Sequence, residues 1–368
     1  MRTMNLEKIK SATRVVYTAL MFELMGCGVI NRRMHDALFH PESATFNITD
    51  NCNSRCITCN AWKQNSVNEL STGEVIDILG QLKDLGISNV GFAGGEPLLR
   101  DDLPELVHKS RETGFANVSI ITNGILLNEG KIITLVESGV TAIGISIDGI
   151  GQTHEMIRGI KGSYVKSVDT LGRLVDLRDR RYPKLDIWVS TTLMKPNMHQ
   201  IKKIIIMCDQ LGVRLFLNLL DTSPYFLSKI DASNLIIGDQ EELDELIDEM
   251  HVLKKSYPSV LTEFHTAIEY ARGHFIDPRR EDIPCCMGYK RIYIGAHGQV
   301  YPGCWVLNPV GSLRENKLDE IVDTSDYRRR LYDMFLKKCP GCACGYPTNL
   351  LYHIPSIMKE AYLRIKMR

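Results

Sequence analysis

Three cysteines lie close together in the stretch TDNCNSRCITCNAW, at a C-x3-C-x2-C spacing: Cys52, Cys56 and Cys59. They follow a short apolar run, residues 44–49, that predicts a β-strand. Three thiolates on one loop can hold three irons of a cubane cluster and leave the fourth iron open for a small molecule. Half of a structural zinc site is the alternative, although such sites usually pair two short knuckles and none follows within about two hundred residues.

A second motif, Gly94-Gly95-Glu96-Pro97, follows the next predicted strand. Glycines at a strand end let backbone carbonyls approach a ligand closely, and a glutamate can accept a hydrogen bond from an ammonium group. The alternative is a glycine turn with Pro97 opening a helix. The position of the motif after a strand favours the binding role.

Further polar side chains follow the later predicted strands. The ends of the third and fourth strands carry Asn123, Ser146, Asp148 and, shortly afterwards, Arg158, which can pair with a carboxylate through two hydrogen bonds. Lys195 and Tyr225 lie near the ends of the last two strands, where they could touch a substrate or shuttle protons. An ordinary role at the rim of a barrel is the alternative for Lys195 and Tyr225.

The C-terminal part of the chain holds a second group of cysteines: Cys285, Cys286, Cys304, Cys339, Cys342 and Cys344. Four of these thiolates would close a second iron-sulfur cluster, and a zinc ribbon is the alternative because four thiolates suit either metal. The two other cysteines of the middle and N-terminal regions, Cys27 and Cys208, lie in apolar or helical surroundings and are predicted to pack in the core.

The elements that must position these residues alternate between strands and helices. Near-continuous apolar runs predict six parallel strands buried on both faces, at residues 44–49, 89–93, 118–122, 142–147, 186–193 and 213–219. Ser71 and Glu74 predict the start of a helix that ends before Gly86, and Gly139 ends another. Two helices, over residues 239–256 and 261–273, then form a connector. Repeated βα units predict a parallel sheet or barrel whose active site lies at the carboxyl ends of the strands.

Composition limits the classes of partner. The 368 residues are 44% hydrophobic, and 44 Lys and Arg balance 44 Asp and Glu, so the chain lacks the positive charge with which proteins bind nucleic acids. Eleven cysteines without a recognisable signal peptide favour a cytoplasmic location. Both ends are basic and apolar, which suggests reversible contact with a membrane surface, although helices packed under the barrel are the favoured alternative.

Together these motifs resemble the radical S-adenosylmethionine (SAM) superfamily. The resemblance implies an α/β fold with a partial (β/α)6 TIM-like barrel, a 4Fe-4S cluster on Cys52, Cys56 and Cys59, and SAM bound at its open iron. It also implies that Gly94 to Pro97 hold the methionine amine, that Asn123, Ser146 and Asp148 contact the ribose and carboxylate, and that Arg158 contacts the carboxylate. Thr58 stands where many members carry an aromatic residue.

The C-terminal cysteines resemble the twitch or SPASM extension, which carries an auxiliary iron-sulfur cluster. By this resemblance the ligands are Cys286, Cys304, Cys339 and Cys342, with Cys285 and Cys344 as substitutes. Gly303 is an extra residue before Cys304, and no later cysteines complete a full SPASM set, so one auxiliary 4Fe-4S cluster is expected. Cys285 is then a candidate hydrogen-atom donor, which would make the reaction an epimerisation.

The predicted organisation has five parts. They are an N-terminal amphipathic extension (1–43), the barrel (44–225), a helical connector (226–280), the auxiliary cluster domain (281–346) and a basic tail (347–368). The expected reaction is hydrogen abstraction from an unactivated carbon of a small-molecule, sugar or lipid-linked substrate, leading to dehydrogenation, bond formation or epimerisation. Maturation of a ribosomal peptide is the alternative, and a non-catalytic electron-transfer or zinc protein is the alternative of another class. The resemblance also implies an external one-electron reductant such as flavodoxin or ferredoxin.

Overall fold

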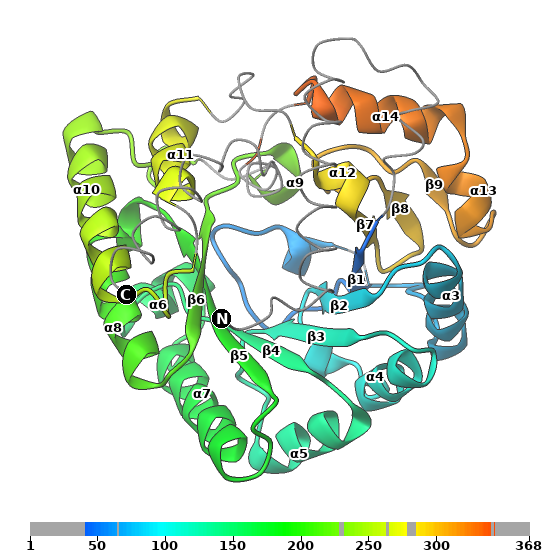
Figure 1. Cartoon of the computed structure of the whole chain (residues 1–368), viewed down its shortest axis with the longest axis horizontal. Coiled ribbons are helices and arrows are strands. Elements are labelled where there is room, and N and C mark those ends of the chain that lie inside the picture. Colours follow the sequence, from blue (N-terminus) through cyan, green and yellow to red (C-terminus); the bar gives the residue numbers. More distant parts are fainter. Residues whose placement is uncertain are drawn as a thin grey trace, which may run out of the picture.

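Six parallel strands follow one another along a curved sheet, as the sequence predicts (Figure 1). The computed structural model describes residues 41–64, 66–227, 232–262, 265–277, 285–339 and 342. The strands are β1 (Ser43–Thr49), β2 (Asn89–Gly94), β3 (Asn117–Thr122), β4 (Ala142–Ser146), β5 (Asp186–Leu193) and β6 (Arg214–Leu219). Each bound lies within one residue of the sequence prediction.

Helices cover the outer side of this sheet (Figure 1). They are α3 (Thr72–Asp84), α4 (Leu103–Glu112), α5 (Glu129–Ser138), α7 (Ser163–Arg180) and α8 (Ile201–Gln210). The predicted capping box is confirmed, because the Ser71 hydroxyl accepts from the Glu74 amide and Glu74 accepts from the Ser71 amide. Gly139 ends α5 with a left-handed φ of 110°, a conformation that favours glycine.

The core runs as a row of apolar side chains across neighbouring strands. In register on β1 to β5 lie Phe46, Phe92, Ile120, Ile143 and Ile187, none more than 3% exposed. Full burial of such a side chain contributes about 1.5–3 kcal/mol, so this row fixes the strand register. The prediction of burial on both faces fails for several strands, among them β2, β3 and β6, and on β5 Trp188, Ser190 and Thr192 are only partly buried. These side chains alternate with the buried core residues and therefore point to the other face of the sheet.

The cysteine-rich segment extends the same sheet, which the sequence did not predict. β7 (Arg291–Ile294) pairs in parallel with β1, and the antiparallel strands β8 (Gln299–Tyr301) and β9 (Gly311–Ser312) follow, giving nine strands. Arg314 pairs with Glu74 of α3 at 2.9 Å between Nε and Oε1. The C-terminal segment is therefore attached to the barrel through backbone and side-chain bonds.

The remaining helices lie outside this outer layer (Figure 1). They are α6 (Gln152–Arg158), α9 (Pro224–Leu227), α10 (Gln240–Ser256), α11 (His265–Ile276), α12 (Met287–Lys290), α13 (Leu318–Val322) and α14 (Ser325–Phe335), with short 3-10 helices at Ala61–Lys63, Pro97–Leu99 and Lys195–Gln200. The predicted connector helices correspond to α10 and α11. Arg272 of α11 joins them through ion pairs to Asp244 and Asp248 of α10.

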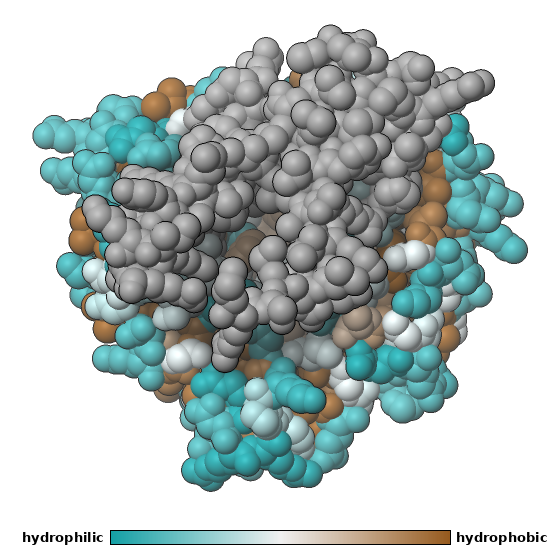
Figure 2. Space-filling model, in the orientation of Figure 1, coloured by the Kyte–Doolittle hydropathy of each residue, from teal (hydrophilic) through white to brown (hydrophobic). Residues whose placement is uncertain are grey.

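The two basic chain ends, residues 1–40 and 343–368, lie outside the described residues, and so does their predicted membrane contact. Among the helices that the structure describes, none combines the length and apolar character needed to cross a bilayer. Away from the grey residues, the visible face in Figure 2 is largely hydrophilic, with apolar side chains scattered between.

Candidate active site

The loop after β1 carries the three cysteines of the first motif. Cys56 is buried, and Cys52 and Cys59 are partly buried. Two backbone amides donate to the sulfurs, Ser54 N to Cys52 Sγ at 3.4 Å and Ala61 N to Cys59 Sγ at 3.3 Å. The other side of the loop is held by α6, because the Arg55 and Ile57 amides donate to carbonyls at the end of that helix.

The electrostatics of this loop fit a metal cluster. Burial, with smaller contributions from Cys56, Glu96 and Cys59, raises the pKa of the Cys52 thiol to about 11, although the hydrogen bond from the Ser54 amide opposes the rise. Metal ions bound to these cysteines would favour the thiolate forms. Amide donors aimed at the sulfurs are also typical of iron-sulfur sites, where they tune the potential. The donor set therefore fits the predicted cluster.

The glycines of the second motif hold the end of β2 against this loop. A Cβ on Gly94 would lie 2.2 Å from the Thr49 carbonyl oxygen, and one on Gly95 would lie 2.1 Å from that of Asn51. Gly94 also has a left-handed φ of 128°. The Gly95 amide donates to Thr49 O at 2.7 Å. Only glycine allows this approach, which brings the backbone of the motif beside the loop that carries the cysteines.

Glu96 is buried behind that contact. Its Oε1 accepts from Thr122 Oγ1 at 2.6 Å and from the Leu98 amide at 3.2 Å, and its Oε2 accepts from the Asn123 amide at 2.9 Å. Burial raises the pKa of Glu96, although these hydrogen bonds oppose the rise. The carboxylate thus ties β2 to β3, a role that the sequence did not indicate. Three bonds leave acceptor capacity on Oε2 for the predicted ammonium group.

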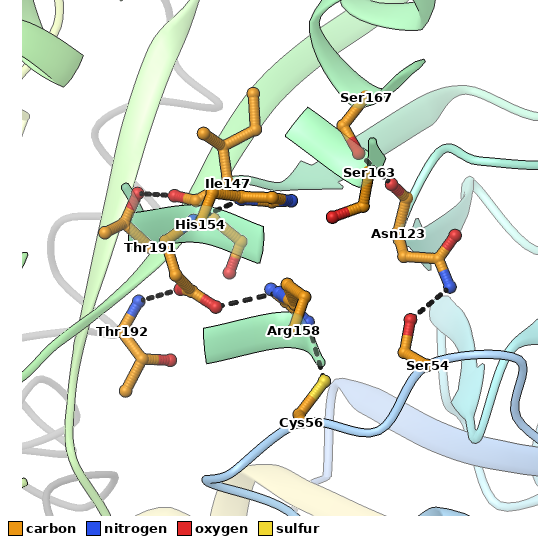
Figure 3. Close-up of polar contacts among 12 residues, drawn as sticks. Ser54, Cys56, Asn123, Ile147, His154, Arg158, Ser163, Ser167, Thr191 and Thr192 are labelled. Carbon is orange, nitrogen blue, oxygen red and sulfur yellow. Dashed lines mark hydrogen bonds and ion pairs between the residues drawn. The ribbon is translucent and has the colours of Figure 1, made fainter. Parts of the chain in front are cut away.

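Asn123 fastens the end of β3 to the cysteine loop. Its Nδ2 donates to Asn53 Oδ1 at 2.7 Å and to Ser54 Oγ at 3.1 Å, while its backbone carbonyl accepts from Ser167 Oγ at 2.7 Å (Figure 3). The side-chain amide is therefore engaged within the protein. Ser146, at the end of β4, is 8% exposed, and its hydroxyl makes no hydrogen bond within the described part of the chain. Of the two predicted ligand contacts, Ser146 is therefore the one whose side chain makes no hydrogen bond in the described part of the chain.

Asp148 and Arg158 form a largely buried ion pair directed at the cysteine loop (Figure 3). Arg158 Nε lies 2.8 Å from Asp148 Oδ2, and Arg158 Nη1 donates to Cys56 Sγ at 3.7 Å. The N–H bond of Arg158 Nε is not directed at Asp148, so the two side chains form an ion pair without a hydrogen bond. Burial alone would lower the pKa of Arg158, but Asp148 and Cys56 outweigh it and raise the pKa. A permanent positive charge therefore lies beside the proposed cluster ligands.

His154 was not singled out from the sequence, yet it belongs to the same group. Its Nδ1 accepts from the Asp148 amide at 3.2 Å, so the proton of the neutral ring is on Nε2. Burial, and then the charge of Arg158, lowers its pKa to about 3, which keeps the ring neutral. Its place four residues before Arg158 on one helix is the only sequence signal for it.

The structure places the two other predicted catalytic residues less centrally. Lys195 is exposed at the start of a 3-10 helix, where its amide donates to Leu235 O at 2.8 Å. Tyr225 lies on α9, but its side chain is outside the described atoms. The nearby Asp221 is a stronger candidate, because its Oδ2 is buried without a hydrogen-bond partner among the residues that the structure describes.

Among the described C-terminal cysteines, Cys285, Cys304, Cys339 and Cys342 interact with one another or with the same side chains. Cys285 packs with Met287 and Met334, and Cys304 contacts that group. The thiol of Cys285 also interacts electrostatically with Cys342 and Cys339. Cys286 instead packs in the main hydrophobic core and is fully buried. Cys286, a predicted ligand, and Cys285, a predicted substitute, thus lie in different surroundings.

Two further facts bear on this second site. Cys344 lies outside the described residues. Within the described part, no three His, Cys, Asp or Glu side chains converge on one metal ion. A cubane does not require such convergence, because each thiolate binds its own iron.

Comparisons with known proteins agree with this geometry. Residues 46–208 match the model of the radical SAM superfamily, and residues 285–344 match that of SPASM, an iron-sulfur cluster-binding domain. The AdoMet-dependent heme synthase of Methanosarcina barkeri is 25% identical over 334 residues, covering 82% of this chain and 91% of that protein. The Fe-coproporphyrin III synthase of the same organism is 33% identical over 167 residues, covering 45% of this chain and only 40% of that protein.

The fold is also that of a solved structure, SuiB from Streptococcus suis bound to its precursor peptide SuiA. The TM-score is 0.65 at 16% identity, and the match covers 95% of this chain and 79% of that one. The two matched domains span more than half of the sequence and coincide with the two groups of cysteines. The chain is therefore a radical SAM enzyme with a C-terminal SPASM domain, and its cofactors are a 4Fe-4S cluster, an auxiliary cluster and SAM.

Proposed function

We propose that this enzyme oxidises a carbon centre of a small-molecule substrate bound between the cysteine loop and the C-terminal cysteines. When bound, the first cluster and SAM supply a 5'-deoxyadenosyl radical that abstracts hydrogen from an unactivated carbon. The observation that carries the proposal is the loop after β1, where three cysteines lie within eight residues and backbone amides donate to two of the sulfurs.

In this proposal the barrel residues hold and orient the cofactors. Cys52, Cys56 and Cys59 ligate the first cluster. The backbone of Gly94 and Gly95 forms a narrow edge beside it, and Glu96 offers its remaining acceptor to the methionine amine. This edge is rigid, because the Glu96 amide donates to Asn51 O of the cysteine loop and its carboxylate accepts from Thr122 and Asn123 at the end of β3. Rigid positioning of this kind lowers the entropic cost of bringing reactants together.

Arg158 supplies positive charge at the same mouth. Its guanidinium is held by Asp148, whose other oxygen accepts from the Thr192 amide at 2.8 Å. The unused Nε hydrogen can serve an anionic group such as a carboxylate. The predicted carboxylate contact thus has a donor, while Ser146 offers a hydroxyl from the end of the neighbouring strand.

The outcome that we propose is oxidation, not epimerisation. An epimerisation would need a thiol free to donate a hydrogen atom, and Cys285 was the predicted donor. Cys285 faces Cys339 and Cys342, which makes it a ligand candidate for the auxiliary cluster. Cys286 is enclosed in the main core and cannot reach a substrate. The substrate electron would then pass to the auxiliary cluster.

A small-molecule substrate is favoured by the heme synthase relative, whose match extends over 91% of that protein. A peptide is the second candidate, because SuiB shares the fold and is bound to a precursor peptide. An external one-electron reductant, such as flavodoxin or ferredoxin, completes the proposal.

The test is the release of 5'-deoxyadenosine by anaerobic, reconstituted and reduced protein given SAM. The wild type should release it, and Cys56→Ala should reduce the release to background because one iron loses its ligand. Cys208→Ala is the matched control, since Cys208 is fully buried in the core on α8, and it should keep the activity. No release by the wild type, or unchanged release by Cys56→Ala, would refute the proposal.

A further inference from the structure

Three buried side-chain atoms at the carboxyl end of β6 have no hydrogen-bond partner in the part of the chain that the structure describes. They are Asp221 Oδ2, Ser223 Oγ and His274 Nδ1. Asp221 and Ser223 lie in the turn that follows β6, and His274 lies on α11. A buried polar atom without a partner destabilises the fold, and native proteins keep few of them. Three at one place therefore suggest a site that a ligand completes.

Printed contacts bring the three side chains together. His274 Nε2 donates to Leu220 O at 2.9 Å, next to Asp221 in the chain. Asp221 Oδ1 accepts from the Ser223 amide at 2.8 Å, and the Ser223 hydroxyl lies near the same carboxylate without the geometry of a hydrogen bond. Ser223 and His274 are at most 4% exposed, whereas Asp221 is partly exposed. The group therefore lies just below the surface of the turn.

Each of the three unused atoms can accept a hydrogen bond. Because a carbonyl oxygen only accepts, the proton of the neutral His274 ring is on Nε2, and Nδ1 carries a lone pair. Burial lowers the pKa of His274, which keeps the ring neutral. Burial raises the pKa of Asp221 to about 6, so its carboxylate is still ionised at neutral pH, and no cation contributes to that pKa. The site thus offers three acceptors and one negative charge.

We propose that Asp221, Ser223 and His274 bind a primary ammonium group of the substrate. An ammonium group has three N–H donors, one positive charge and no acceptor, so it complements these three atoms. A carboxylate or phosphate would instead meet two acceptors and a like charge. The site therefore selects an amine over an acid.

The position of this site suits a substrate of the proposed reaction. The turn after β6 lies at the carboxyl ends of the parallel strands, as do the cysteine loop after β1 and the polar ends of β3 and β4. An amine held there would orient the rest of the substrate within the barrel mouth. In this respect the inference rests on the proposed function, whereas binding of the ammonium group does not depend on it.

The test measures the melting temperature of the anaerobic holoenzyme at neutral pH against rising concentrations of n-propylammonium chloride. Binding to the folded state should give a saturable rise in melting temperature. Tetramethylammonium chloride has the same charge but no N–H donor, and it should give no saturable rise. Asp221→Asn should weaken the affinity for n-propylammonium by about tenfold to a hundredfold, the usual effect of losing one charge-assisted hydrogen bond.

Asp101→Asn is the matched control, because it makes the same change at an exposed carboxylate and should bind n-propylammonium like the wild type. Ser223→Ala should weaken the affinity by a smaller factor, and it decides the test if Asp221→Asn does not give folded holoenzyme. Equal effects of the two cations on the wild type would overturn the inference. So would an unchanged affinity in Asp221→Asn, or in Ser223→Ala where that variant decides.

An ammonium group can also come from a peptide side chain, for which Nα-acetyl-lysine amide is the probe. If it binds more tightly than n-propylammonium, and Asp221→Asn weakens both, the site is kept and belongs to a peptide substrate. None of these measurements requires turnover. Release of 5'-deoxyadenosine is measured separately, so failure of the proposed function is distinguishable from failure of this inference.

Discussion

The charges around Cys56 come from side chains that are themselves buried. Arg158 contacts the Cys56 sulfur, and Asp148 holds Arg158 in place. His154 stays neutral beside them because burial and Arg158 lower its pKa to about 3. The charge beside the proposed ligands therefore comes from Arg158 and does not change across the physiological pH range.

Asp221 provides a prediction at the same scale. Its Oδ1 accepts from the Ser223 amide at 2.8 Å, but its buried Oδ2 has no partner in the described part of the structure. Burial, with a smaller contribution from Cys342, raises its pKa to about 6. Between about pH 4 and pH 6 the folded state therefore binds more protons than the unfolded state, so stability falls as pH rises. Asp221→Asn should remove a penalty of about 3 kcal/mol at pH 8, estimated from the size of the pKa shift.

The measurement compares melting temperatures of the holoenzyme and the Asp221→Asn variant at pH 5 and pH 8. The gain in melting temperature should be larger at pH 8, where the wild-type carboxylate is ionised. Asp101→Asn, at an exposed position, is the control and should show no such difference. An equal gain in melting temperature for Asp221→Asn at both pH values would mean that burial does not destabilise the ionised carboxylate.

Individual residues could be named from the sequence where the signal is local. The spacing of Cys52, Cys56 and Cys59 and the order of the glycine motif are visible in a few neighbouring letters. The different surroundings of Cys285 and Cys286 were not visible, because they depend on how two adjacent side chains pack next to α12.

At the scale of elements, the glycine motif works through the packing of one strand end on another. Gly95→Ala would place a methyl group 2.1 Å from the carbonyl oxygen of Asn51, which lies between the end of β1 and Cys52. To relieve this overlap, the cysteine loop must move away from the glycine motif. A displacement of about 1 Å can cost about a hundredfold in rate, so the release of 5'-deoxyadenosine should fall by about that factor.

Gly73→Ala is the matched control for this prediction. Gly73 lies in the first turn of α3, and a Cβ there would have nothing within 4 Å. Alanine is also a better helix former than glycine, so the control should be fully active and no less stable. Equal activities of the two variants would show that the close approach of β2 to the cysteine loop is not required.

The elements themselves were largely predictable. The six strands and the caps of α3 and α5 follow from apolar runs, a capping box and a glycine, which are short-range signals. The attachment of β7 to the free edge of β1 was not predictable, because it joins residues about 250 positions apart and neither strand encodes its partner. The alternation of burial on β5 was missed for a related reason, since it depends on what fills the barrel.

On the scale of the whole molecule, the parallel pairing of β1 with β7 links the two groups of cysteines. The loop that follows β1 carries Cys52, Cys56 and Cys59, and the segment before β7 carries Cys285. Both groups are therefore attached to neighbouring strands of one sheet (Figure 1). Because the two strands are parallel, the loop after β1 and the segment before β7 lie at opposite ends of this strand pair, so the two groups form separate sets of ligands.

That separation is the central claim, and the iron content of one triple variant tests it most directly. Reconstituted wild-type protein should hold about eight irons, and the protein with Cys52, Cys56 and Cys59 all changed to alanine should hold about four, because one cubane of two is lost. The remaining cluster should still give its paramagnetic signal on reduction, without any response to SAM. A wild type with about four irons, or a triple variant with none, would contradict the account of two independent clusters.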